Sequence, residues 1–62
     1  MDIEVYSSTV KRLEGLSFTI DEPSKGIDLD IGGVVISVAD VKVSGDLLVL
    51  TSPNIIVRAI II

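Results

Sequence analysis

Hydrophobic and polar residues alternate along most of this chain with a period of two residues. Successive side chains of a β-strand point to opposite faces, so this alternation predicts strands with one apolar face. It is clearest in Leu16–Ile20 and Ile27–Ile31, and Gly, Pro, Asn and Asp separate the apolar segments as in turns. The pattern predicts strands over residues 2–5, 16–20, 27–31, 34–38, 41–43, 47–51 and 55–62.

Residues 7–13 fit two local structures. Val10 and Leu13 have the spacing of a helical turn that Ser7 would cap, whereas the β-branched Thr9 and Val10 suit a continued strand, which we favour. No convincing helix occurs elsewhere. Six to seven short, mostly antiparallel strands predict one all-β domain over residues 1–62, built as a small barrel or a two-layer sandwich.

The last strand, Ile55–Ile62, is apolar on both faces and carries one charge, Arg58. Leu47–Thr51 has the same character, and Ser52-Pro53-Asn54 predicts a tight turn that joins the two as a hairpin. The earlier strands have one apolar face each, so they are expected to cover only one side of this hairpin. We therefore expect homo-oligomerisation to complete the core, unless residues 34–43 cover the second side. The predicted interface consists of Leu48, Leu50, Ile56, Arg58, Ile60 and Ile62.

The small size of the chain favours the same conclusion. A domain of about 60 residues buries only about 60% of the surface of its unfolded chain, and such domains gain stability from disulfides, metals or association. The chain has no Cys and no His, which excludes disulfides and the commonest zinc sites. Association therefore remains as the expected source of additional stability.

The formal net charge of −4 limits the classes of partner. It argues against nucleic acid, whose binding depends on Lys and Arg, and against anionic membrane surfaces. No run approaches the roughly 20 apolar residues of a membrane span, and the acidic Met1–Glu4 is not typical of a signal peptide. We expect a cytoplasmic location, with a virion component as an open alternative.

No catalytic residue, cofactor site or metal site is predicted. Without His or Cys, no Ser-His or Cys-His pair can form. Asp21-Glu22, Asp28 and Asp30 offer oxygen ligands for a cation, but their spacing does not fit an EF-hand, and a solvated strand face is the simpler interpretation. Gly32-Gly33 lacks the G-x-x-x-x-G-K-[ST] frame of a phosphate loop and predicts a turn or bulge.

One group of residues near the N-terminus and the single residue Arg58 each have two interpretations. Tyr6, Lys11 and Arg12 combine an aromatic ring with two cations, as single-stranded nucleic-acid platforms do, although an ordinary set of surface residues is the simpler interpretation. Arg58 either pairs with a buried carboxylate, for which Asp40 or Asp46 is available, or extends from the rim into water.

Two short resemblances to nucleic-acid-binding families are present. Residues 41–46, Val-Lys-Val-Ser-Gly-Asp before an apolar strand, resemble the second motif of Sm-like RNA-binding proteins. Ser24-Lys25-Gly26, with Gly45-Asp46 and the closing strand, is similar in outline to the swapped-hairpin AbrB-type DNA-binding domains. The chain lacks the first motif and N-terminal helix of the former, and the proline, helix and basic residues of the latter. It is therefore assigned to neither family.

The sequence thus favours a non-enzymatic, homo-oligomeric β module that acts through assembly or protein–protein interaction. The alternative is a small β-barrel that binds nucleic acid, in the manner of a transcription regulator. A binding titration with DNA or RNA separates the two, because phosphate contacts make affinity steeply dependent on salt.

Overall fold

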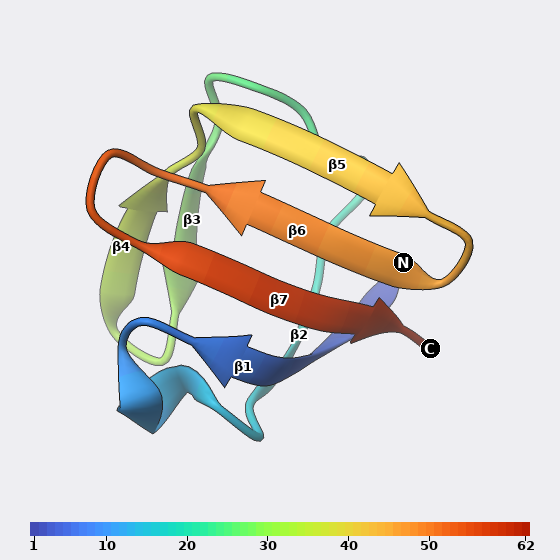
Figure 1. Cartoon of the computed structure of the whole chain (residues 1–62), viewed down its shortest axis with the longest axis horizontal. Coiled ribbons are helices and arrows are strands. Elements are labelled where there is room, and N and C mark those ends of the chain that lie inside the picture. Colours follow the sequence, from blue (N-terminus) through green and yellow to red (C-terminus); the bar gives the residue numbers. More distant parts are fainter.

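The computed structural model describes all 62 residues and contains seven antiparallel strands in two sheets (Figure 1). The larger sheet has the strand order β2-β1-β7-β6-β5, and the β3–β4 hairpin forms the second sheet behind it. The all-β prediction is confirmed, and of the two predicted architectures the closed barrel is wrong. The strands are β1 (Asp2–Ser8), β2 (Ser17–Thr19), β3 (Asp28–Ile31), β4 (Val34–Ser37), β5 (Asp40–Ser44), β6 (Leu47–Thr51) and β7 (Ile56–Ile61).

Two glycines close the turn between β3 and β4. Ile31 pairs with Val34, which leaves Gly32 and Gly33 as a two-residue loop with φ of 58° and 86°. Positive φ at both central residues defines the type I′ turn, which matches the twist of an antiparallel hairpin. The Gly33 N–H also donates a 2.9 Å hydrogen bond to Asp30 Oδ1. The Gly-Gly pair therefore forms a turn rather than a bulge.

The predicted hairpin over residues 47–62 is present as β6 and β7, and it occupies the middle of the larger sheet. Strand β1 pairs with the free edge of β7, and β5 pairs with the free edge of β6. Ile3 and Val5 therefore extend the hairpin's own apolar face instead of packing over it. The β3–β4 hairpin, with Ile31 and Ile36 buried, supplies the cover.

The core forms within one chain. Its accessible surface is 3750 Å², close to the about 3,900 Å² expected for a compact monomer of this mass. Self-association is therefore not needed to make the chain compact. Eleven hydrophobic side chains are buried together: Ile3, Val5, Leu13, Ile20, Ile31, Ile36, Val38, Leu48, Leu50, Val57 and Ala59.

The segment between β1 and β2 differs from the continued strand that we favoured. The strand ends at Ser8, and Lys11–Leu13 forms one 3-10 turn that buries Leu13 completely. The Ser8 side chain accepts a 3.1 Å hydrogen bond from Val10 N, which stabilises the change of direction.

The structure contains no helix with the length and apolar character needed to cross a bilayer.

Candidate functional site

The two faces of the five-stranded sheet have different surroundings. The face toward the β3–β4 hairpin carries Val57 and Ala59, which are fully buried. The opposite face, here called the outer face, has no second layer over it (Figure 1). Because side chains alternate along a strand, the neighbours Ile56, Arg58 and Ile60 lie on this outer face and are exposed.

Strand register aligns the outer-face residues in two rows across the sheet. In one row, Ile60 of β7 lies between Glu4 of β1 and Leu47 of β6. In the next row, Val49 of β6 lies between Arg58 and Lys42. Side chains directly opposite on neighbouring strands are within contact distance. The rows therefore form a continuous surface across strands that are distant in sequence.

A β-bulge adds Tyr6 to this surface. The β1–β7 register shifts between Val5, opposite Ala59, and Ser7, opposite Arg58, so Tyr6 is the extra residue. Bulges reorient side chains and reset the alternation of faces. Beyond the bulge, Ser8 faces inward with 4% of its surface exposed, whereas Tyr6 is 49% exposed.

Three large apolar side chains are exposed on the outer face. Leu47, Ile56 and Ile60 retain 45%, 43% and 37% of their side-chain exposure, although they belong to the two central strands. A shallow groove of about 640 Å³ includes Leu47, whereas Ile56 and Ile60 do not line it. Hydrophobic surface gathered in this way marks interaction sites more often than isolated exposed side chains do. The groove is lined by Tyr6, Lys42, Val43, Ser44, Leu47, Val49 and Arg58.

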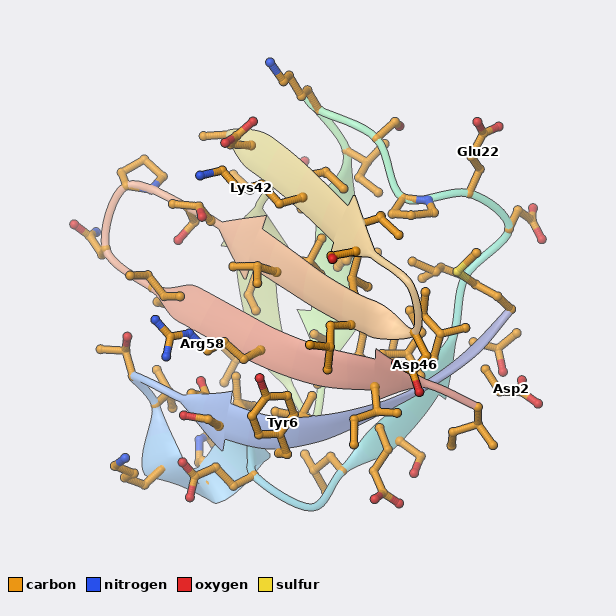
Figure 2. All side chains as sticks on the ribbon, turned by 45° about the vertical axis from the view of Figure 1, so that its right-hand side comes forward. Asp2, Tyr6, Glu22, Lys42, Asp46 and Arg58 are labelled. Carbon is orange, nitrogen blue, oxygen red and sulfur yellow. The ribbon has the colours of Figure 1, made fainter.

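Charge is separated along the outer face, as Figure 2 shows. Lys42 and Arg58 lie toward one end, and Asp2 and Asp46 lie toward the other. Glu4 is also exposed, opposite Ile60 in the row next to Arg58. Neither Lys42 nor Arg58 makes an ion pair. Along the outer face, the basic row of Arg58 and Lys42 thus lies between Ile56 and the row of Ile60 and Leu47.

Two other cations are already paired. Lys25 Nζ lies 3.6 Å from Asp40 Oδ1, and Lys11 Nζ lies 3.3 Å from Glu14 Oε2. The Ser8 N–H and the Lys11 ammonium both donate to the Glu14 carboxylate, and these bonds lower the pKa of Glu14 below its ordinary 4.5. These pairs leave Lys42 and Arg58 as the unpaired cations of the outer face.

The residues predicted as an interface do not share one face. Leu48 is opposite Ala59 and Leu50 is opposite Val57, so both point into the core and are fully buried. Their assignment to an accessible surface is wrong, because the register of β6 against β7 was not readable from the apolar pattern. The remaining four, Ile56, Arg58, Ile60 and Ile62, are exposed on the outer face or beside it.

The outer face also contains residues that the sequence did not identify. Lys42, Leu47 and Val49 join it through the β5–β6–β7 register. Of the two expected positions for Arg58, the exposed one is correct, since no carboxylate pairs with it. Of the aromatic and basic group near the N-terminus, Tyr6 lines the groove and Arg12 does not.

The acidic residues considered as a cation site do not come together. No group of three or more Asp or Glu side chains is placed to hold a metal ion. Asp28 and Asp30 are exposed on β3, on the far side of the molecule from the groove.

Comparison with protein-family models, curated proteins and solved structures found no match for this chain.

Proposed function

We propose that this protein is a non-enzymatic β module that self-associates face to face through the outer face of its five-stranded sheet. The carrying observation is the combination of exposed apolar side chains with separate basic and acidic residues on one face. Such a face is complementary to a second copy of itself, which is the requirement for a symmetric dimer.

The exposed apolar side chains of the outer face supply a moderate driving force. Tyr6, Leu47, Ile56 and Ile60 are each between 37% and 49% exposed. Burying the exposed parts of four such side chains from each of two copies stabilises a dimer by about 5–10 kcal/mol. Association itself costs about 4–15 kcal/mol. The two ranges overlap, so we expect a dimer that dissociates on dilution rather than an obligate one.

Charge fixes the relative orientation of the two copies. A twofold axis that runs across the strands, between the Arg58 row and the Ile60 row, places the Arg58 row of each copy over the Ile60 row of the other. Arg58 then lies over Ile60 and beside Glu4 of the second copy, and Lys42 lies near Asp46. Complementary potentials of this kind select orientation and speed encounter more than they add affinity.

The molar mass measured by light scattering over a dilution series tests this proposal. We expect the weight-average mass to fall from about twice the 6.6 kDa of one chain toward the monomer as the protein is diluted. Added salt should weaken the dimer only slightly, because screening reduces the charge contacts and leaves the apolar ones. A monomer at every accessible concentration contradicts the proposal.

Binding of single-stranded nucleic acid is the second candidate function. It is favoured by one observation, that Tyr6, Lys42 and Arg58 line the same groove, since aromatic rings and cations together bind unstacked bases and phosphates. The acidic end of the same face and the net charge of −4 oppose it. Anisotropy of a labelled oligonucleotide distinguishes the two, because only this candidate gives affinity that falls steeply with salt.

A further inference from the structure

A second depression, of about 230 Å³, lies at the corner of the outer face where β1 ends and the 3-10 turn follows. Its lining is mostly polar, in contrast to the groove, and no carboxylate contributes to it. Arg58 lines both depressions. The lining residues are Ser7, Ser8, Thr9, Lys11, Ile56 and Arg58.

The hydroxyl groups of this depression are available as donors. Thr9 Oγ1 accepts a 3.1 Å hydrogen bond from Ile56 N, and Ser8 Oγ accepts one of 3.1 Å from Val10 N. A hydroxyl that accepts in this way keeps its own proton free to donate. The Ser7 hydroxyl has no hydrogen-bond partner in the structure.

Two cations complete the set of donors. Arg58 has no ion-pair partner, and Lys11 is paired only with Glu14, which does not line the depression. The Lys11 side chain is 80% exposed, and exposed ion pairs of this kind contribute little and exchange readily. Lys11 can therefore turn toward a ligand at small cost.

We propose that this depression binds the phosphate group of a small phosphate ester. Arg58 and Lys11 would neutralise its charge, and the hydroxyls of Ser7 and Thr9 would donate to its oxygens. Phosphate oxygens accept more hydrogen bonds than a carboxylate does, and guanidinium binds them in a bidentate manner. The volume exceeds the about 30 Å³ of one liquid water several-fold, which accommodates a tetrahedral group.

The adjoining groove indicates an ester rather than the free ion. Tyr6 and Val49 lie on the other side of Arg58, along the groove that this residue shares with the depression. An apolar or aromatic group attached to the phosphate would lie against them. Phenyl phosphate is therefore expected to bind more tightly than inorganic phosphate, and equal affinities would assign the site to the free ion.

An NMR titration of the full chain at constant ionic strength tests the proposal, with inorganic phosphate and phenyl phosphate as probes. We expect saturable shifts of the Ser7, Thr9 and Ile56 amides, with dissociation constants roughly in the millimolar range. Lys11→Gln should weaken phenyl phosphate binding about tenfold, since it removes a charge-assisted contact. Arg12→Gln removes the same charge from the same turn, outside the depression, and should leave the affinity unchanged.

Shifts that do not saturate, or equal weakening by Lys11→Gln and Arg12→Gln, would overturn the proposal, because they indicate general charge attraction. Both proposals use Arg58, so phenyl phosphate and a second copy compete for it, and the titration is made at a dilution where light scattering gives a monomer. A chain that is monomeric at every concentration without the ester, and that binds it, supports this site and contradicts the proposed dimer. A monomer at that dilution whose corner amides do not respond contradicts this site alone.

Discussion

The inner and outer faces of the central hairpin are built from residues of similar hydrophobicity that have different surroundings. On β7, Val57 and Ala59 are fully buried, whereas Ile56 and Ile60 retain 43% and 37% of their exposure. The smallest apolar side chain of the strand is in the core, and larger ones are at the surface. Hydrophobicity alone therefore does not decide which face is covered.

The two faces differ in exposure because the chain supplies only one further layer to cover the five-stranded sheet. The β3–β4 hairpin is the only second sheet, and it covers one face. A compact core has formed without the outer face, so Ile56 and Ile60 add little to the stability of the monomer. We interpret the inner face as the part that specifies the fold and the outer face as the part available for association.

The largest expected difference in the free energy of unfolding is between alanine variants of two adjacent residues of β6, Leu47 and Leu48. Leu48→Ala removes a fully buried side chain and should lower the free energy of unfolding by about 2–5 kcal/mol. Leu47→Ala acts on the outer face and should lower it by less than about 1 kcal/mol under monomeric conditions. Urea unfolding followed by circular dichroism measures both. Equal losses would remove the distinction between the faces.

A second pair of variants tests how the β3–β4 hairpin packs over the inner face. A Cβ at Gly32 would lie 2.6 Å from Leu16 Cδ1, whereas a Cβ at Gly33 meets no atom within 4 Å. Both residues have positive φ, which costs an L-residue about 1–2 kcal/mol. Gly32→Ala should therefore destabilise the fold more than Gly33→Ala in thermal unfolding. The reverse order would indicate that the hairpin does not pack as described.

A smaller effect is expected from the charges of the outer face. Arg58→Glu should weaken the proposed dimer by about five- to thirtyfold, because a surface ion pair contributes about 0.5–1 kcal/mol and the twofold axis makes each pair occur twice. Glu4→Arg in the same chain should restore part of the affinity, because the opposite charges are then exchanged. Sedimentation equilibrium of the single and double variants measures this coupling. If the losses of dimer affinity from the two single variants simply add in the double variant, the proposed orientation is contradicted.

The smallest effect concerns Glu14, outside both faces of the hairpin. The hydrogen bond from Ser8 N, and next the one from Lys11, lower the pKa of Glu14 below 4.5 in the folded state. Its contribution to stability is therefore complete above pH 4.5 and is lost as the pH falls through the lower, folded-state pKa. Glu14→Gln should flatten the acid side of the stability profile slightly. An unchanged profile would show that these bonds do not persist in solution.

Much of the fold was predictable, because alternation and turn chemistry are local signals. The strands near residues 16–20, 27–31 and 34–38 and the 47–62 hairpin follow from them. The register of β6 against β7 was not predictable, and a shift of one residue exchanges the faces. Leu48 and Leu50 were therefore assigned to the wrong side. The bulge at Tyr6 has no local sequence signal, since it depends on pairing with a strand more than fifty residues away.

The candidate site was predictable only in part. The apolar excess of the last strand predicted an interface at Ile56 and Ile60, which stays a prediction, and both side chains are exposed in the single chain. The groove depends on Tyr6, Lys42 and Arg58 meeting across four strands of the sheet. These three residues come together because of the order of the strands in the sheet. Short antiparallel strands of similar composition do not specify that order.

The central claim is that the outer face drives association and does not specify the fold. The most direct test compares the molar masses of Ile60→Asp and Val35→Asp by light scattering, at concentrations where the unaltered chain is dimeric. Val35 is a matched control, because it is 64% exposed on β4, away from the outer face. We predict a folded monomer for Ile60→Asp and an unchanged dimer for Val35→Asp. A dimer that survives Ile60→Asp, or equal dissociation by both, would contradict the account.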